Sequence, residues 1–500
     1  MNSQAEAPAD TVPDGLEDVL TTAAGAAPAL IAGTPADRAG WLRAVADRVD
    51  AAADELVPAA IEESHLPEAR LRGEVSRSSG QLRMFADALE SGALLEVVID
   101  TADPDAKPVP RPDLRRMLVP VGPVLVFAAS NFPFAFSVCG GDTAAALAAG
   151  CPVVVKAHPG HPRTSLLTFE VMAAALAESG APPGILGLVH GVDAGVRALR
   201  DPRVRAAAFT GSVPGGLALH EVAASRPDPI PFYGELGSIN PTFVTDAAVR
   251  ARGAEIAEGF IGSYTLGVGQ FCTKPGLLFL PTGHGLEDRL READAVAAAR
   301  MLYPAIGTGF SAGLDRLRKL DGVDVLVDGD PGDGDGTGPV APSLLRTTVP
   351  ILLSHPDSLF EECFGPVSVV VEYQDPAELR AAAEAMPGSL TATVHAEDGD
   401  REAVRPLVDQ LARRAGRVIW NGWPTGVAVT WAMQHGGPFP STVGSVHTSV
   451  GATAARRFQR PVCYQNTPQA MLPEPLRDTN RLGIERRVDG QVTHGDVSNP

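Results

Sequence analysis

The chain has 500 residues, of which 45% are hydrophobic, and 41 basic against 60 acidic side chains give a formal net charge of −19. This length exceeds one ordinary domain, so at least two core-forming units are expected in a globular protein. The acidic balance argues against nucleic acids and anionic membranes as partners, because both require basic patches. No uninterrupted apolar run of about 18 residues exists, so no membrane span is expected.

Five cysteines are scattered along the chain, at positions 139, 151, 272, 363 and 463. No CxxC pair occurs, so neither a zinc site nor a disulfide framework is indicated, and we expect no metal. A reducing cytoplasm fits this cysteine usage best. Residues 1–24 begin with no basic stretch and no apolar core, which predicts a short polar tail rather than a signal peptide.

The first elements in the chain are helices, predicted over residues 34–98. Thr34-Pro35-Ala36-Asp37 supplies an N-cap, a proline at the first helical position and an acid in the first turn, and apolar residues then follow at helical spacing. Residues 99–116 are polar and rich in proline, which predicts an extended segment that forms an exposed arm or an edge hairpin.

From about residue 117, apolar strands alternate with helices. Strands are predicted at 121–130, 151–158, 187–191 and 205–212, and helices at 135–149 and 164–178. This alternation predicts right-handed βαβ units around a parallel sheet, in which ligands bind beyond the carboxyl ends of the strands. Asn131, Lys156 and Gly211–Ser212 each fall just after a strand, so we expect them along one edge of the sheet.

A second α/β unit is predicted from INPTFV (239–244) to about residue 460. Its Asp/Gly-rich loop at 328–338 is a solvated turn rather than an EF-hand, because the twelfth position counted from Asp328 is Pro339 and not glutamate. Three tryptophans, at positions 420, 423 and 431, form either core or a pocket wall. Residues 470–500 are polar and predicted to be irregular or an edge strand.

Cys272, in GQFCTKPG, is the first candidate for chemistry. Glycines and small polar residues around a thiol let a substrate approach closely, and a thiolate attacks carbonyl carbon. Glu235, in GELGSINP, is a carboxylate that can accept a proton. On spacing alone, a small buried cysteine without function is the commoner outcome.

Asn131 and Lys156 are candidates at the predicted sheet edge. The amide of Asn131 can hold a developing oxyanion together with the backbone N–H of Cys272, or it can cap a turn. Lys156 ends an apolar strand and needs a partner, which a ribose hydroxyl, a phosphate or a structural carboxylate can supply. His158 and His161 share its loop, and we predict solvent-facing histidines there rather than metal ligands.

Two further motifs suggest a nucleotide. In FTGSVPGG (209–216), Gly211 and Ser212 can let a dinucleotide lie against a helix start, although an ordinary turn between a strand and a helix fits equally well. GTGFSAG (307–313) is a weaker glycine cluster. In EECFGP (361–366), Glu362 can hold ribose hydroxyls and Phe364 can pack against a flat ring, or the motif is a helix end followed by a turn.

Six motifs occur in order: ASNFPF, VVVKAHPGHP, FTGSVPGG, GELGSINP, GQFCTKPG and EECFGP. Together they resemble the NAD(P)-dependent aldehyde dehydrogenase superfamily over roughly residues 25–480. FCTKPG, KAHPGHP and the late segments NGWPTGV, HGGPFPST, RPVCYQ and LPEPLRD are similar to the 2-oxoglutarate semialdehyde (2,5-dioxopentanoate) dehydrogenases of sugar-acid and hydroxyproline catabolism. NADP-linked long-chain aldehyde dehydrogenases are similar to this branch.

The resemblance implies a role for each candidate. Cys272 attacks the aldehyde to form a thiohemiacetal, Asn131 and the Cys272 N–H hold its oxyanion, and Glu235 activates water to hydrolyse the resulting thioester. The hydride acceptor is NADP or NAD. Its binding residues are implied to be those that surround its ribose and phosphate groups: Lys156, His158, Gly211, Ser212, Glu362 and Phe364.

The implied fold is α/β and aldehyde dehydrogenase-like, with three parts. Residues 25–98 and 119–237 form a Rossmann-type nucleotide-binding domain, 238–469 form a catalytic domain, and 99–118 with 470–500 form a small β oligomerisation arm. An exposed β arm favours pairing with another subunit, so a homodimer or homotetramer is expected. Pro159 stands where NAD-preferring members carry a glutamate that repels a 2′-phosphate, so NADP is permitted.

We therefore expect irreversible oxidation of 2-oxoglutarate semialdehyde to 2-oxoglutarate. The alternatives are a medium- or long-chain aliphatic aldehyde as substrate, a cysteine-dependent esterase without redox chemistry, and a non-catalytic nucleotide-binding protein. No arginine can be assigned to the substrate carboxylate. Five are conceivable, with solvated surface positions as the default: Arg115, Arg116, Arg163, Arg456 and Arg460.

Overall fold

A parallel five-stranded sheet organises the first α/β unit of the computed structural model, which describes residues 15–497. Its strand order is β5-β4-β3-β6-β7, and every pairing is parallel. The strands are β3 (Val124–Phe127), β4 (Val153–Lys156), β5 (Leu186–Val189), β6 (Ala206–Thr210) and β7 (Phe232–Glu235). The predicted alternation of strands and helices is confirmed.

Helices cover both faces of this sheet because successive strand residues point to opposite sides. Val124 and Val126 pack with one group of helices: α2 (Pro35–Ala51), α3 (Ala53–Ser64), α4 (Glu68–Glu90), α5 (Gly141–Ala149) and α6 (Pro162–Glu178). Leu125 and Phe127 pack with the other group: α1 (Leu16–Ala32), α7 (Val192–Arg200) and α8 (Val213–Ala224). The capping box predicted at Thr34 and Asp37 forms at the start of α2.

The second α/β unit is built on a seven-stranded sheet of order β11-β13-β14-β9-β8-β15-β16, parallel except for β11. Its strands are β8 (Thr242–Val244), β9 (Leu277–Pro281), β11 (Asp324–Val327), β13 (Ser343–Thr348), β14 (Val367–Tyr373), β15 (Ser389–His395) and β16 (Ala415–Trp420). Its helices are α9 (Asp246–Thr265), α10 (Glu287–Leu290), α11 (Pro304–Arg318), α12 (Val349–Ser354), α13 (Pro356–Leu359), α14 (Pro376–Ala385) and α15 (Arg401–Leu411). A small ribbon pairs β10 (Ala299–Arg300) with β12 (Pro339–Val340).

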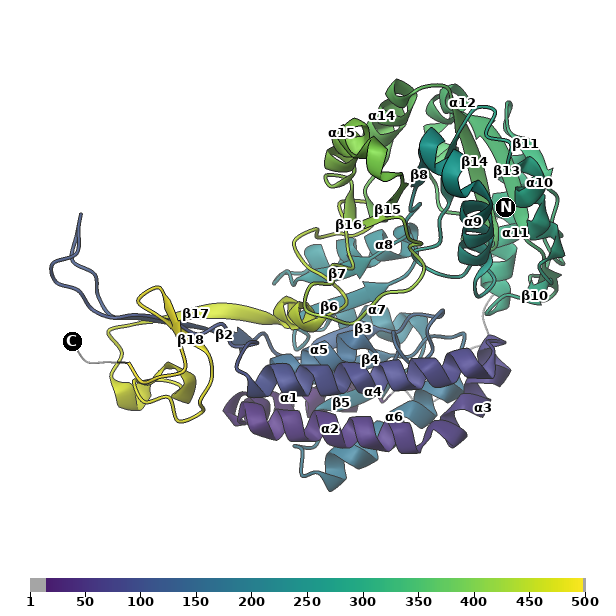
Figure 1. Ribbon diagram of the computed structural model, residues 1–500. Coiled ribbons are helices and arrows are strands. Elements are labelled where there is room, and N and C mark those ends of the chain that lie inside the picture. Colours follow the sequence, from purple (N-terminus) through teal and green to yellow (C-terminus); the bar gives the residue numbers. More distant parts are fainter. Residues whose placement is uncertain (1–14, 498–500) are drawn as a thin grey trace.

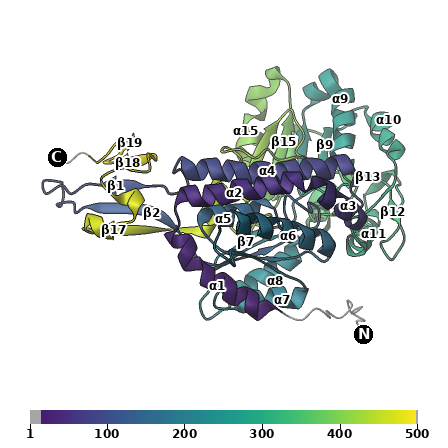
Figure 2. The ribbon, with the colours of Figure 1, turned by 90° about the horizontal axis from the view of Figure 1, so that it is seen from below.

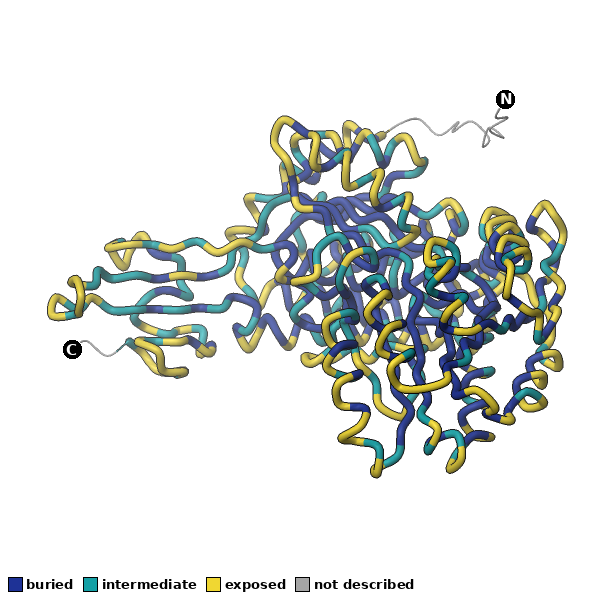
Figure 3. The backbone as a smooth tube through the Cα atoms, turned by 90° about the horizontal axis from the view of Figure 1, so that it is seen from above, coloured by how far each residue is buried: buried dark blue, intermediate teal, exposed yellow. Residues whose placement is uncertain are grey.

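A β arm projects away from both units (Figures 1 and 2). Its sheet has the order β17-β2-β1-β18-β19, and the strands are β1 (Val98–Asp100), β2 (Leu114–Pro120), β17 (Gln459–Gln465), β18 (Arg486–Val488) and β19 (Gln491–Thr493). Its own apolar cluster includes Leu95, Ile99 and Leu476. In Figure 3 buried backbone fills the two α/β units, whereas much of the arm is exposed.

Three sequence expectations about boundaries are wrong. Residues 16–24, expected in the polar tail, belong to α1, whose Leu16, Leu20 and Ala23 are buried against the first sheet. The remainder of that tail, up to residue 14, lies outside the described residues. β17, expected in the catalytic domain, pairs with β2 in the arm. The helix expected at 135–149 begins only at Gly141, because residues 132–140 form turns. We propose the same three-part division, with residues 16–24 assigned to the nucleotide-binding domain and β17 assigned to the arm.

Other expectations concern single segments. Within residues 328–338 the structure has turns and no regular element, as expected for a solvated loop. Trp420 and Trp431 are 41% and 52% exposed, so neither is core, whereas Trp423 packs near Phe260 and His395. None of the helices within residues 15–497 is long and apolar enough to cross a membrane.

Candidate active site

The carboxyl ends of four parallel strands bring the candidate side chains together. Lys156 and Glu235 are the last residues of β4 and β7, Gly211 directly follows β6, and Asn131 lies in the loop after β3. The expected grouping along one edge of the sheet is therefore what the structure has, and Glu235 joins it. The second α/β unit faces this edge and supplies the thiol.

Cys272 lies on the loop between α9 and β9, and its side chain is partly buried. This loop approaches the segment around Gly365 so closely that a side chain at Gly269 (φ 64°) would place its Cβ 2.2 Å from the Gly365 carbonyl oxygen. Only glycine fits there. Asn240 fixes the loop from the other side, because its Nδ2 donates to the carbonyls of Cys272 (2.8 Å) and Lys274 (3.0 Å).

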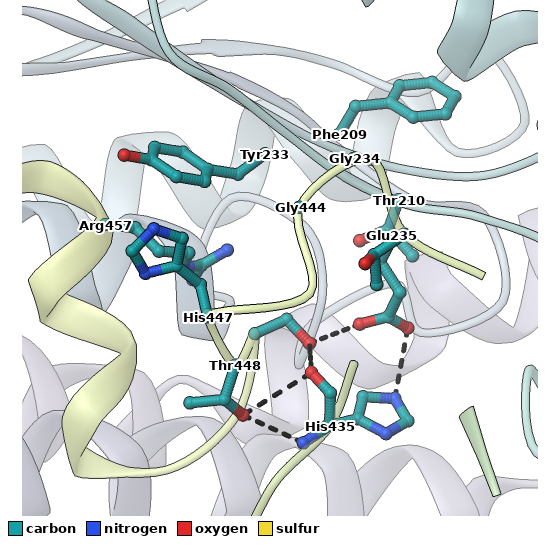
Figure 4. Close-up of a pocket in the computed structure, with 12 residues that line it drawn as sticks. Phe209, Thr210, Tyr233, Gly234, Glu235, His435, Gly444, His447, Thr448 and Arg457 are labelled. Carbon is teal, nitrogen blue, oxygen red and sulfur yellow. Dashed lines mark hydrogen bonds and ion pairs between the residues drawn. The ribbon is translucent and has the colours of Figure 1, made fainter. Parts of the chain in front are cut away.

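His435 links the thiol to the carboxylate, and sequence reasoning missed it. Its Nε2 lies 3.5 Å from Cys272 Sγ and 3.0 Å from Glu235 Oε1. The Sγ, Nε2 and carboxylate atoms all lie within 4.8 Å of one another. Figure 4 shows Glu235 and His435 pointing toward each other. The sequence signal for it was a histidine directly before Gly436-Gly437, in the segment that carries the three tryptophans.

The electrostatics of these groups differ. Burial raises the pKa of the Cys272 thiol well above its usual value, and Glu235 and Glu362 raise it further. Burial also raises the pKa of Glu235, but His435 and a hydrogen bond from Ser449 outweigh burial and hold that pKa below its usual range. Glu235 is therefore an ionised acceptor at neutral pH, whereas the thiol must lose its proton during the reaction.

Asn131 lies against the loop that carries the thiol. Its Nδ2 donates to the carbonyl of Gln270 at 3.2 Å, and Arg70 Nη2 donates to the Asn131 carbonyl at 2.6 Å. Asn131 is 8% exposed, so its amide is held in a buried position close to Cys272. One amide hydrogen is enough for the bond to Gln270, which leaves the other for an oxyanion.

Glu362 and Phe364 lie on the loop that contacts the thiol loop. Lys274 joins the two loops, because its buried Nζ donates to the carbonyls of Cys363 (2.7 Å) and Val367 (2.8 Å). A Cβ on Gly237 would lie 2.6 Å from Glu362 Oε2, so the carboxyl packs against the backbone that follows Glu235. Burial raises the pKa of Glu362 to about 7, although Lys274 acts in the opposite direction.

The first turn of α8 presents Gly211 and Ser212 to solvent. Ser212 caps this helix by accepting a hydrogen bond from the N–H of Gly215 at 3.3 Å. Gly211 lies against the ring of Phe209, where a Cβ would come within 2.6 Å of Cζ. An exposed helix start lined by small residues suits a phosphate group.

The prediction of solvent-facing histidines after β4 is wrong. His161 is 1% exposed, and its ring nitrogens contact the Ala129 carbonyl at 2.9 Å and Ser165 Oγ at 3.1 Å. His158 is partly buried against the ring of Tyr303, and burial together with His161 and Lys156 lowers its pKa to about 2. His158 Nδ1 also accepts a hydrogen bond from the N–H of Gly160 at 3.0 Å, so both imidazoles have partners within the protein.

Comparison with known proteins decides the family. The chain matches the aldehyde dehydrogenase family over residues 5–305 and 313–459. It belongs to that family. The enzyme is thus an oxidoreductase that acts on aldehydes. It is 46% identical over 464 residues to alpha-ketoglutaric semialdehyde dehydrogenase 2 of Azospirillum brasilense, covering 91% of this chain and 88% of that protein. It is 43% identical to alpha-ketoglutaric semialdehyde dehydrogenase of Acinetobacter baylyi, covering 92% and 88%.

Solved structures share the fold of this aldehyde dehydrogenase. A mutant of aldehyde dehydrogenase C from Pseudomonas syringae, solved with NAD+ and octanal, superposes with a TM-score of 0.76 at 20% identity, covering 91% of this chain and 90% of that chain. An NAD-dependent aldehyde dehydrogenase from Sinorhizobium meliloti gives 0.74 at 24% identity, covering 91% and 88%. The expected aldehyde dehydrogenase-like α/β fold is confirmed.

Proposed function

We propose that this aldehyde dehydrogenase oxidises 2-oxoglutarate semialdehyde to 2-oxoglutarate, with NADP preferred to NAD. The substrate rests on one observation, the two relatives named for it that are 46% and 43% identical over more than nine-tenths of the chain. The chemistry rests on the cluster of Cys272, His435 and Glu235.

In the first half of the reaction, Cys272 Sγ attacks the aldehyde carbon and the carbonyl oxygen becomes an oxyanion. His435 Nε2, 3.5 Å from Sγ, accepts the proton of the thiol when that nitrogen carries none, and Glu235 Oε1, 3.0 Å from the same nitrogen, can accept it next. Asn131 Nδ2 and the backbone N–H of Cys272 stabilise the oxyanion. The residues at the sheet edge, Lys156 and Glu362 among them, would hold a nicotinamide dinucleotide, which would supply the hydride acceptor needed to convert the thiohemiacetal on Cys272 to a thioester.

In the second half, water replaces sulfur on the acyl carbon. Glu235 is ionised and buried, and it lies within 4.8 Å of the thiol, so it can take a proton from a water placed beside the thioester. Hydroxide adds to the carbonyl carbon, the carbon–sulfur bond breaks, and the carboxylate product leaves. The thiol recovers a proton, and His435 provides the path between it and Glu235.

The residues at the sheet edge fit a dinucleotide. The exposed start of α8 at Gly211 and Ser212 accommodates the pyrophosphate, Lys156 and Glu362 would hold ribose hydroxyls, and His158 lies beside Lys156 on the same loop. Phe364 is partly buried beside Glu362, where a ring can pack. Pro159 leaves no carboxylate at the position that would repel a 2′-phosphate, so this loop permits NADP.

Assembly and location are part of the proposal. The arm has two edge strands, β17 and β19, which supports pairing with another copy in a homodimer or homotetramer. All five cysteines are free, which supports a reducing compartment, the cytoplasm.

Initial rates of nicotinamide reduction test the proposal. The purified enzyme is assayed with 2-oxoglutarate semialdehyde and with decanal, each with NADP and with NAD. We expect kcat/KM for the semialdehyde to exceed that for decanal by about 100-fold or more, since a site that recognises a charged carboxylate rejects a molecule lacking it. A higher value for decanal would assign the enzyme to aliphatic aldehydes, and product formed without a nicotinamide would identify an esterase.

A further inference from the structure

Arg77 lies on α4, and its side chain is partly buried. Its Nε and Nη2 atoms are buried and have no hydrogen-bond partner among residues 15–497. It also forms no ion pair within the described chain. Buried polar atoms are normally satisfied, and a buried charge without a partner is costly. A group left in this state is suited to a ligand that brings its own negative charge.

The position of Arg77 is beside the reacting thiol. Its guanidinium carbon lies 5.6 Å from the ring centroid of Phe132 and 5.2 Å from that of Phe136, and these rings belong to the loop that carries Asn131. Burial lowers the pKa of Arg77, while the nearby charges of Cys272, Glu74 and Glu235 act to raise it. Arg77 is in turn the first of two cations that lower the pKa of Cys272. The ring of Phe136 also lies 6.4 Å from that of His435, which contacts Cys272 Sγ, so Phe136 and His435 connect the guanidinium to the thiol.

The other arginines near Cys272 are already engaged. Arg70 donates through Nη2 to Asn131 and through Nε to Glu74. Arg417, the second cation that acts on Cys272, donates through Nη1 and Nη2 to the carbonyls of Gly426 (3.1 Å) and Pro424 (2.7 Å). Arg77 alone of the three keeps its Nε–Nη2 edge unused, and this edge matches the two oxygens of a carboxylate.

The arginines that the sequence offered for a substrate carboxylate lie elsewhere. Arg115 pairs with Asp113 and Asp478 in the arm, Arg163 with Glu62, and Arg456 with Glu96. Arg116 and Arg460 are exposed on the arm strands β2 and β17.

Gln81 lies one helical turn beyond Arg77, on the same face of α4. Its Nε2 is buried and has no partner among the described residues, while its Oε1 would lie 2.9 Å from a Cβ at Gly141. Gly141 also adjoins Ser449, which donates to Glu235. The Gln81 amide therefore lies between Arg77 and the Ser449 that contacts Glu235, and its Nε2 can still donate a hydrogen bond.

We propose that Arg77 binds the carboxylate of the substrate side-on through Nε and Nη2, and that Gln81 donates to the adjoining 2-oxo group. This rests on the proposed function, because it takes the substrate to be a 2-oxo acid with a terminal aldehyde. Four C–C bonds of about 1.5 Å give such a molecule an extended length of about 5 Å, so a molecule whose aldehyde carbon is bonded to Cys272 Sγ needs a cation within about that distance of the thiol for its carboxylate.

The test compares charged and uncharged aldehydes in variants of α4. Arg77→Met and Arg77→Lys are assayed with 2-oxoglutarate semialdehyde and with pentanal, and Arg72→Met is the matched control, since Arg72 is an exposed arginine on the same helix. We expect kcat/KM for the semialdehyde to fall about 100-fold in Arg77→Met and about 10-fold in Arg77→Lys, with pentanal changed less than about 3-fold in Arg77→Lys, which keeps a cation near the thiol. Arg77→Lys carries the test if Arg77→Met does not fold.

Gln81→Leu tests the contact between Gln81 and the 2-oxo group. The comparison substrate is glutarate semialdehyde, which lacks that group. The variant should lose about 10-fold on 2-oxoglutarate semialdehyde and little on glutarate semialdehyde. Inhibition by 2-oxoglutarate, which carries both the carboxylate and the 2-oxo group, should weaken in the Arg77 and Gln81 variants but not in Arg72→Met, as a binding measurement independent of turnover. One outcome is that the wild type prefers 2-oxoglutarate semialdehyde while Arg77→Lys lowers kcat/KM equally for both aldehydes, or for neither. In that case this inference fails and the proposed function stands. If the wild type shows no preference, both fail.

Discussion

At the residue scale, the proposed chemistry depends on three groups with different electrostatic surroundings. Burial keeps Cys272 protonated at neutral pH, whereas neighbours keep Glu235 ionised although it is 4% exposed. His435 Nε2 contacts both, so it can take a proton from the thiol and pass it to Glu235. The thiol is thus protonated and unreactive at rest, and its activation requires transfer of its proton to His435 or Glu235.

Replacing His435 by Gln should slow the formation of the thioester. We expect kcat/KM for the aldehyde to fall about 100-fold, because proton transfer by a positioned side chain contributes at least that factor. In the wild type, the rate at which iodoacetamide alkylates Cys272 should still increase with pH at pH 9, since a raised thiol pKa moves thiolate formation to higher pH. His447→Gln is the control, as that ring packs on Tyr233. Equal losses in the two variants would remove His435 from the mechanism.

Glu362 predicts a pH dependence of cofactor binding. Its pKa is raised to about 7, so the carboxylate that can accept hydrogen bonds from ribose hydroxyls forms as pH increases through neutrality. For a single group of pKa near 7, the ionised fraction rises about 10-fold between pH 6 and pH 8. Fluorescence titration should give a Kd for NADP about 10-fold lower at pH 8, and this slope should vanish in Glu362→Gln. A variant that keeps the slope would show that another group titrates.

At the element scale, helix starts and loop approaches position the site. α8 begins directly after β6 at a serine cap, and the loops of Cys272 and Glu362 are held together by Lys274 and by a glycine contact. Ser212 therefore caps α8, and the proposed function gives it a second role in the surface that α8 offers to a phosphate.

Ser212→Ala should reveal both roles. We expect the free energy of unfolding to fall by about 1 kcal/mol and the Kd for NADP to rise several-fold. Thr34→Ala removes the cap of α2, which lies in a different part of the unit, so it should cost about the same stability and leave the Kd unchanged. Urea unfolding and fluorescence titration measure the two quantities. If both variants weaken cofactor binding alike, general destabilisation and not α8 explains the effect.

Local signals predicted much of this fold. The cap at Thr34 and the alternation of apolar strands with helices are properties of a few neighbouring residues, so the first sheet was predictable. His435, Asn240 and Arg77 were not, because each acts on a partner far away in sequence. The burial of His161 likewise depends on Ala129, which lies 32 positions earlier. Cys272 and Glu235 were identified by motifs and resemblance, since spacing alone left Cys272 undecided.

At the scale of the whole molecule, the arm is the part that stands apart from the two α/β units. It extends from the two α/β units in both ribbon views and carries a separate apolar cluster (Figures 1 and 2). Its edge strand β19 exposes Val492, which is 54% accessible. An exposed sheet edge with apolar side chains favours association, so we expect the arm to pair with a second copy.

A charge on the arm edge should therefore disrupt assembly. Val492→Asp is expected to reduce the mass measured by light scattering from two or four chains of 51.9 kDa to a smaller species. Val325→Asp, on the edge strand β11 of the second unit, is the control and should keep the wild-type mass. A wild type that already runs as a monomer would contradict the role of the arm.

The most direct test of the account is to trap the covalent intermediate. Glu235→Gln is mixed with 2-oxoglutarate semialdehyde and NADP, and intact-protein mass spectrometry with peptide mapping follows. We predict one equivalent of NADPH and one acyl group attached to the peptide that contains Cys272, because hydride transfer proceeds while hydrolysis is slowed. Full turnover in this variant, or an acyl group on any other residue, would contradict the assignment of Cys272 as nucleophile and Glu235 as base.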